Sequence, residues 1–110
     1  MNKINQLIIL LLVIISTFLF CNYGYVMHHE KTHEEIYKIH GCEEIEISYN
    51  AFKGETVCLK HAEVIDEMYL QEQELHAINE IVSYNLRAFA AIILLLFTIF
   101  MVYDVLKQKP

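Results

Sequence analysis

Apolar side chains gather in two blocks near the ends of the chain, and the stretch between them is polar. The first block, Ile4 to Met27, has 24 residues without a charged side chain, and the second, Ala88 to Tyr103, has 16. A helix rises about 1.5 Å per residue and the hydrocarbon core of a bilayer is about 30 Å thick, so the first block is long enough to cross it. The second block reaches about 24 Å, and Leu86, Val105 and Leu106 extend it to a sufficient length.

The two blocks predict a membrane protein of mainly α class, built as a two-helix transmembrane hairpin. We place the spans at residues 4–23 and 86–106, with an extracytoplasmic domain at residues 24–85 between them. A cleaved signal peptide competes for the first block, but the residues that follow it lack the small side chains that signal peptidase requires. A buried core helix competes for the second block, but a chain of 110 residues has too little polar surface left to cover both.

The basic residues beside the spans predict the orientation. Lys3 precedes the first span, and Lys107 and Lys109 follow the second. The positive-inside rule therefore places both termini in the cytoplasm of a multi-pass protein of the cell membrane. Residues 24–85 carry 13 acidic residues against 4 lysines, which suits the translocated side, whereas Arg87 at the outer end of the second span runs against the rule.

Periodicity predicts a small α+β fold for the external domain. Residues 25–40 have helical spacing and can continue the first span. Residues 43–50 alternate apolar and polar side chains, as in a half-buried strand, and residues 56–59 can return as its partner after a turn at Lys53-Gly54. Residues 61–85 have helical spacing again and run into the second span. The domain is thus expected to contain two helices and one β-hairpin.

Two of the three cysteines flank the predicted hairpin. A disulfide between Cys42 and Cys58 would close it, and an extracytoplasmic loop permits oxidation. The alternative is a structural zinc knuckle, because His40 and His61 lie close to these cysteines and complete a set of two nitrogen and two sulfur ligands. We favour the disulfide because of the outward topology. Cys21 lies in the first span and stays unpaired.

The segment from His29 to His33 reads H-E-x-x-H. Residues four apart share one face of a helix, so both imidazoles can reach one metal ion while Glu30 points toward a water beside it. Zinc lowers the pKa of such a water, and a carboxylate in this position can accept its proton and pass it to a leaving amine. The motif thus predicts a zinc site on a helix, with Glu30 as the catalytic base.

A second motif supplies a third ligand. Residues 77–80 read A-I-N-E. Together with the H-E-x-x-H segment, they resemble the zinc-binding helices of thermolysin-like gluzincin metallopeptidases. The resemblance implies a zincin-like helix, three Zn²⁺ ligands and a general base, namely His29, His33, Glu80 and Glu30. The hairpin departs from that family, because it follows the first motif, whereas the substrate-binding edge strand of gluzincins precedes it.

Two further residues belong to the predicted site as an additional ligand or as partners that orient a ligand. His76 shares a helix face with Glu80 through its i, i+4 spacing, and two antiparallel spans would bring it level with His33. Tyr84 stands where thermolysin-like enzymes carry an aspartate that orients the first histidine.

Net charge narrows the class of partner. A formal charge of −6 without a basic cluster argues against nucleic acid as a binding partner. Besides the lipid bilayer, we expect a peptide substrate or a protein partner at the outer membrane face. The sequence therefore predicts a minimal membrane-anchored zinc metallopeptidase. The alternative is a non-enzymatic two-span protein whose acidic external domain binds a partner or a structural metal.

Overall fold

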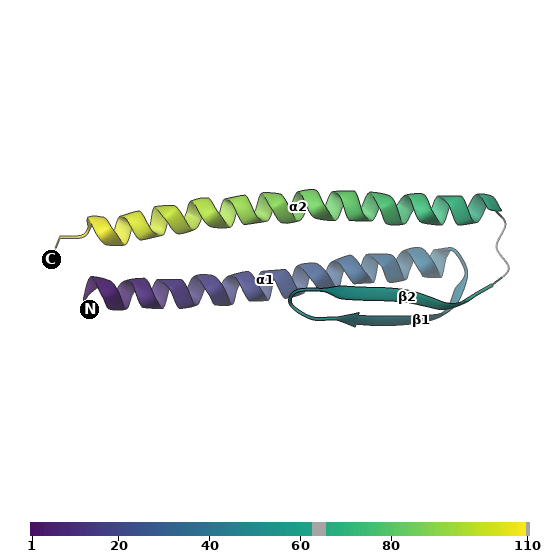
Figure 1. Ribbon diagram of the computed structural model, residues 1–110, viewed down its shortest axis with the longest axis horizontal. Coiled ribbons are helices and arrows are strands. Elements are labelled where there is room, and N and C mark those ends of the chain that lie inside the picture. Colours follow the sequence, from purple (N-terminus) through teal and green to yellow (C-terminus); the bar gives the residue numbers. More distant parts are fainter. Residues whose placement is uncertain (63–65, 110) are drawn as a thin grey trace.

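The computed structural model describes residues 1–62 and 66–109. It contains two long helices and a two-stranded sheet, in the order α1 (Lys3–Ile39), β1 (Cys42–Tyr49), β2 (Gly54–His61) and α2 (Asp66–Lys107). The helices lie side by side and antiparallel, and the hairpin of strands packs along the second half of α1 (Figure 1). At the other end of the molecule, Lys3 Nζ donates to the carbonyl oxygen of Leu106 at 3.0 Å. The chain is therefore an elongated helical hairpin, 71 × 21 × 13 Å.

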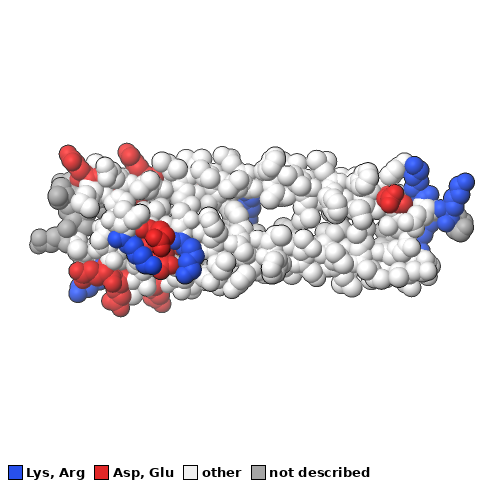
Figure 2. Space-filling model, turned by 180° about the vertical axis from the view of Figure 1, so that it is seen from behind, with Lys and Arg blue, Asp and Glu red and all other residues white. Residues whose placement is uncertain are grey.

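Both helices are long and apolar enough to cross a membrane. With 37 and 42 residues, they reach about 55 Å and about 63 Å, roughly twice the thickness of a hydrocarbon core. None of the most apolar window of either helix is buried against the rest of the chain. The surface between the charged ends of the molecule is mostly white in Figure 2, apart from one blue patch near the middle. The predicted continuation of the first apolar block into residues 25–40 is confirmed, because α1 is unbroken.

Local sequence explains where α1 begins and ends. Asn2 caps its start, since its side-chain oxygen accepts the backbone N–H of Asn5 at 2.8 Å. After His40, the chain turns at Gly41, whose φ of +85° lies in the left-handed region that glycine adopts without steric cost. The helix therefore stops where the sequence predicts, and the chain reverses into β1.

The strands form the predicted antiparallel hairpin, and a disulfide joins Cys42 to Cys58. This bond confirms the predicted pairing and rules out the zinc knuckle, because bonded sulfurs cannot serve as thiolate ligands. His40 is buried instead, with its Nδ1 2.8 Å from the carbonyl oxygen of Ile36. Among the described residues, Cys21 is the cysteine that forms no disulfide.

Two predicted boundaries shift in the structure. The turn comes before Gly54, and Asn50 holds it by accepting the backbone N–H groups of Phe52 and Lys53 at 2.8 and 3.0 Å. His61 is the last residue of β2 rather than the first residue of a helix, because strand pairing with β1 extends that far. The start predicted for the second helix otherwise falls partly on residues 63–65, which lie outside the described part of the chain.

The interior of the described molecule is mainly polar. Its buried apolar residues are Val26 and Ile36. Its buried polar or charged residues are Asn22, Glu30, His40, Glu72 and Ser83. Burying polar groups costs free energy unless they find partners, so a small domain that buries more polar than apolar side chains sacrifices stability there. Such an interior points to a functional site between the helices.

Candidate metal centre

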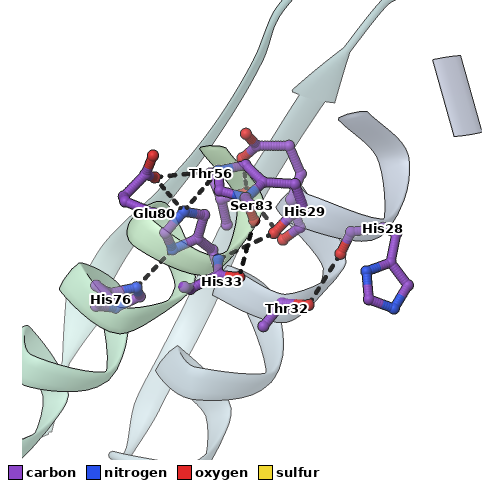
Figure 3. Close-up of polar contacts among 10 residues, drawn as sticks. His28, His29, Thr32, His33, Thr56, His76, Glu80 and Ser83 are labelled. Carbon is purple, nitrogen blue, oxygen red and sulfur yellow. Dashed lines mark hydrogen bonds and ion pairs between the residues drawn. The ribbon is translucent and has the colours of Figure 1, made fainter. Parts of the chain in front are cut away.

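Three ligand-type side chains converge where α1 faces α2. His29 and His33 come from α1 and Glu80 from α2 (Figure 3). Oε1 of Glu80 lies 3.0 Å from Nε2 of His29 and 2.8 Å from Nε2 of His33, and the two Nε2 atoms lie 3.2 Å apart. The described residues contain no other such group of three His, Cys, Asp or Glu donors. The cluster can therefore hold a metal ion.

The spacing of these donors agrees with tetrahedral coordination. Zinc-to-ligand distances of about 2.0 to 2.1 Å place neighbouring ligand atoms of a tetrahedral site about 3.3 Å apart. The observed separations of 2.8 to 3.2 Å are a few tenths of an ångström shorter. Small outward movements of the side chains would give three corners of a tetrahedron and leave the fourth open.

The cluster is partly sheltered from solvent. The side chains of His29 and His33 are 14% and 13% exposed, whereas that of Glu80 is 52% exposed. Burial raises the pKa of the Glu80 carboxyl, but the hydrogen bond with His33 and the charge on His29 outweigh it and hold the pKa below its usual value. Glu80 is therefore ionised at neutral pH, as a metal ligand must be.

Ser83 holds the His29 ring, and the sequence did not reveal it. The buried Ser83 places its Oγ 2.7 Å from Nδ1 of His29. With Nε2 of His29 facing a metal, Nδ1 carries the hydrogen and donates it to this oxygen. Ser83 lies three residues after Glu80, on the same face of α2, and this spacing is the signal that could have identified it. Tyr84 lies nearby, is 75% exposed and lines a cavity. The hydrogen-bond partner of Nδ1 of His29 is the neighbouring Ser83 rather than Tyr84.

His76 lies behind His33 rather than among the converging atoms. Its Nδ1 is 2.6 Å from Nδ1 of His33, and its side chain is only 13% exposed. Burial lowers the pKa of His76 to about 4, and the charges of His33 and His40 act in the same direction. His76 is consequently neutral at physiological pH and can accept a hydrogen bond from His33.

Glu30 is buried between α1 and the hairpin. It is 4% exposed, and the Thr56 hydroxyl on β2 donates to its Oε2. The backbone of Gly54 lies close to the same side chain, since a Cβ atom built at this glycine would lie 2.5 Å from Cγ of Glu30. The Glu30 side chain is thus held in one place by two residues of β2.

Glu30 and Glu80 both line two cavities, of about 470 and 290 Å³. The larger cavity lies between β2 and α2, with Thr56 on one side and Ala77 on the other. The smaller one extends along the helices toward Arg87. A molecule in either cavity would lie beside the carboxylates of the predicted motif.

The remaining described histidines lie outside the cluster. Figure 3 shows the His28 ring turned away from it, and only the backbone carbonyl of His28 takes part in the drawn contacts, by accepting from Thr32. Nε2 of His61 lies 3.6 Å from the Glu72 carboxylate.

Comparison of the chain with protein-family models, curated proteins and solved structures finds no match. Its function is therefore inferred from the geometry of this cluster and its surroundings.

Proposed function

We propose that the chain is a minimal membrane-anchored zinc metallopeptidase, with Zn²⁺ held by His29, His33 and Glu80. The observation that carries the proposal is the convergence of three donor atoms from two helices, 2.8 to 3.2 Å apart. Two imidazoles and one carboxylate are a donor set of catalytic zinc sites, which keep a fourth position open for water or substrate.

The chemistry needs a base beside the open position, and we assign that role to Glu30 because it lines the same two cavities as Glu80. When bound, zinc supplies a Lewis acid that lowers the pKa of a water and polarises a carbonyl group. Glu30 accepts a proton from the attacking water as the water oxygen bonds to the carbonyl carbon. It then delivers that proton to the amide nitrogen as the C–N bond breaks. Thr56 occupies only part of the hydrogen-bonding capacity of the carboxylate, which leaves lone pairs for this transfer.

The larger cavity supports a peptide as the substrate. It runs along β2 at Gly54, Glu55 and Thr56, opposite α2. In the described sheet, β2 pairs only with β1, so its other edge is not paired with a strand. An extended peptide can add to such an edge through main-chain hydrogen bonds, which would align its carbonyl groups with the cluster.

The hairpin supports the membrane placement that we propose. The ends of α1 and α2 that carry Lys3 and Lys107 lie together, and the metal cluster lies in the half of the molecule away from them (Figure 1). The positive-inside rule places the lysine end in the cytoplasm. We therefore propose that the site acts at the outer membrane face, within the domain at residues 24–85.

Two isosteric variants test the proposal, because it gives the two glutamates different jobs. Glu80→Gln removes a ligand, so zinc occupancy and peptide hydrolysis should fall together. Glu30→Gln should keep zinc bound while lowering the hydrolysis rate by about 10² to 10⁴, the contribution of a general base. Both are measured on the detergent-purified full chain, by metal analysis and by cleavage of a fluorogenic peptide library.

The control is Glu74→Gln, which changes an exposed glutamate on α2 and should alter neither quantity. If both site variants lose zinc equally, Glu30 is itself a ligand and the site is a closed structural one. That result would favour the non-enzymatic alternative.

A further inference from the structure

Glu72 is a buried carboxylate for which the proposed reaction has no use. It is 0% exposed and lies on α2, one turn before His76. Within the described part of the chain, neither of its oxygens has a hydrogen-bond partner, and the same is true of Nε2 of His76. A buried, unpaired carboxylate is costly, so its presence calls for a role.

A line of contacts joins Glu72 to the metal cluster. Oε1 of Glu72 lies 3.8 Å from Nε2 of His76, and Nδ1 of His76 lies 2.6 Å from Nδ1 of His33. The His33 ring then presents Nε2 to the cluster at the other end. Tyr37 packs on the His76 ring, with centroids 4.5 Å apart, and helps to fix its position.

Only one arrangement of hydrogens suits all these contacts when a metal is bound. The metal takes the lone pair on Nε2 of His33, so the hydrogen of that ring is on Nδ1. His33 then donates to Nδ1 of His76. The accepting Nδ1 of His76 carries a lone pair, so the hydrogen of this ring is on Nε2, the atom that faces Glu72. A shift of about 0.6 to 1 Å would shorten this contact from 3.8 Å to hydrogen-bonding distance.

We propose that Glu72 and His76 are positioning residues that hold His33 in its metal-binding tautomer and raise the basicity of its Nε2. This inference rests on the proposed metal site. Groups that hydrogen-bond to the far nitrogen of a ligating histidine typically change metal affinity by about 10-fold to 100-fold. Burial serves this role, because a carboxylate polarises its hydrogen-bonding neighbour more strongly where water is excluded.

The first test compares Co²⁺ binding by the full chain, followed from the visible absorption of the ion. Glu72→Gln keeps the shape of the side chain and removes its charge, and we expect Co²⁺ affinity about 10-fold to 100-fold lower. Glu74→Gln is the matched control, since it makes the same change at an exposed position of the same helix, and its affinity should be unchanged. Equal affinities in the two variants would overturn the proposal.

The second test needs no substitution. Nitrogen-15 NMR of the histidine rings in the Zn²⁺-loaded protein should place the hydrogen of His33 on Nδ1 and that of His76 on Nε2. The reverse assignment would overturn the proposal. So would a second bound ion that Glu72→Gln removes, because such an ion would sit between Glu72 and His61, whose Nε2 lies 3.6 Å from the carboxylate.

The results separate this inference from the proposed function. Co²⁺ binding that depends on Glu72 in a protein without hydrolytic activity would support the positioning role and contradict the peptidase. Co²⁺ binding by His29, His33 and Glu80 that ignores Glu72 would contradict the positioning role alone. A wild-type protein that binds no Co²⁺ would contradict both.

Discussion

Replacing Gly54 with alanine should disable the base without disturbing the metal. A Cβ atom at this position would lie 2.5 Å from Cγ and 2.9 Å from Cδ of Glu30, whereas ordinary contacts begin at 3.4 Å. The Glu30 side chain or β2 must therefore move by about 0.9 Å, the difference between 2.5 and 3.4 Å. A misplacement of about 1 Å in a catalytic group can cost about 10²-fold in rate.

We accordingly expect Gly54→Ala to lower peptide hydrolysis about 100-fold and to leave zinc content unchanged, because Glu30 is not a ligand in this account. The assay is initial-rate hydrolysis of a fluorogenic peptide by the detergent-purified protein, with metal analysis of the same sample. Gly24→Ala is the control, since a Cβ there meets nothing within 4 Å. Full activity in Gly54→Ala would refute the assignment of Glu30 as the base, and loss of zinc would show that the hairpin supports the ligands.

The remaining predictions concern a ligand partner, pH and topology. Ser83→Ala should weaken zinc binding about 10-fold to 100-fold, measured by competition with a chelator, because His29 loses the oxygen that accepts its Nδ1 hydrogen; an unchanged affinity would contradict this role. The pKa of His76 is about 4 in the folded chain, against an ordinary value of 6.5. Between these two pH values, the unfolded chain therefore binds more protons than the folded chain. The metal-free protein should accordingly lose thermal stability as pH falls from 6.5 toward 4. His76→Gln should flatten that loss, and an equally steep loss in the variant would assign it to other groups. A tag fused to Pro110 should resist protease added to intact cells, whereas ready cleavage would contradict the cytoplasmic location of the termini.

The elements that could be predicted from the sequence are those fixed by local patterns. Apolar runs and helical spacing gave the long continuous helices, and Gly41 marked the end of α1. Cys42 lies at the start of β1 and Cys58 near the end of β2, and an antiparallel hairpin brings these two positions together, which is why their pairing was foreseeable. Boundaries at the turn and at His61 were missed, because strand pairing rather than residue preference sets them.

The candidate site could be predicted only in part, because some of its contacts form only when the two helices pack together. His29 and His33 share a helix face by spacing alone, and antiparallel helices bring Glu80 to them. Ser83 carries no motif, and its role appears only when α2 packs on α1. Glu72 is one of 12 glutamates among residues 24–85, and the sequence does not distinguish a fully buried carboxylate from the exposed ones around it.

The metal content of the purified full chain is the decisive measurement for the metal site. We predict one Zn²⁺ per chain, lost when His29 and His33 are both replaced by alanine. The same chain with His28→Ala should keep its zinc, because that neighbouring ring points away from the cluster (Figure 3). A wild-type protein without a bound metal ion, or a double variant that retains it, would contradict the assignment of this site.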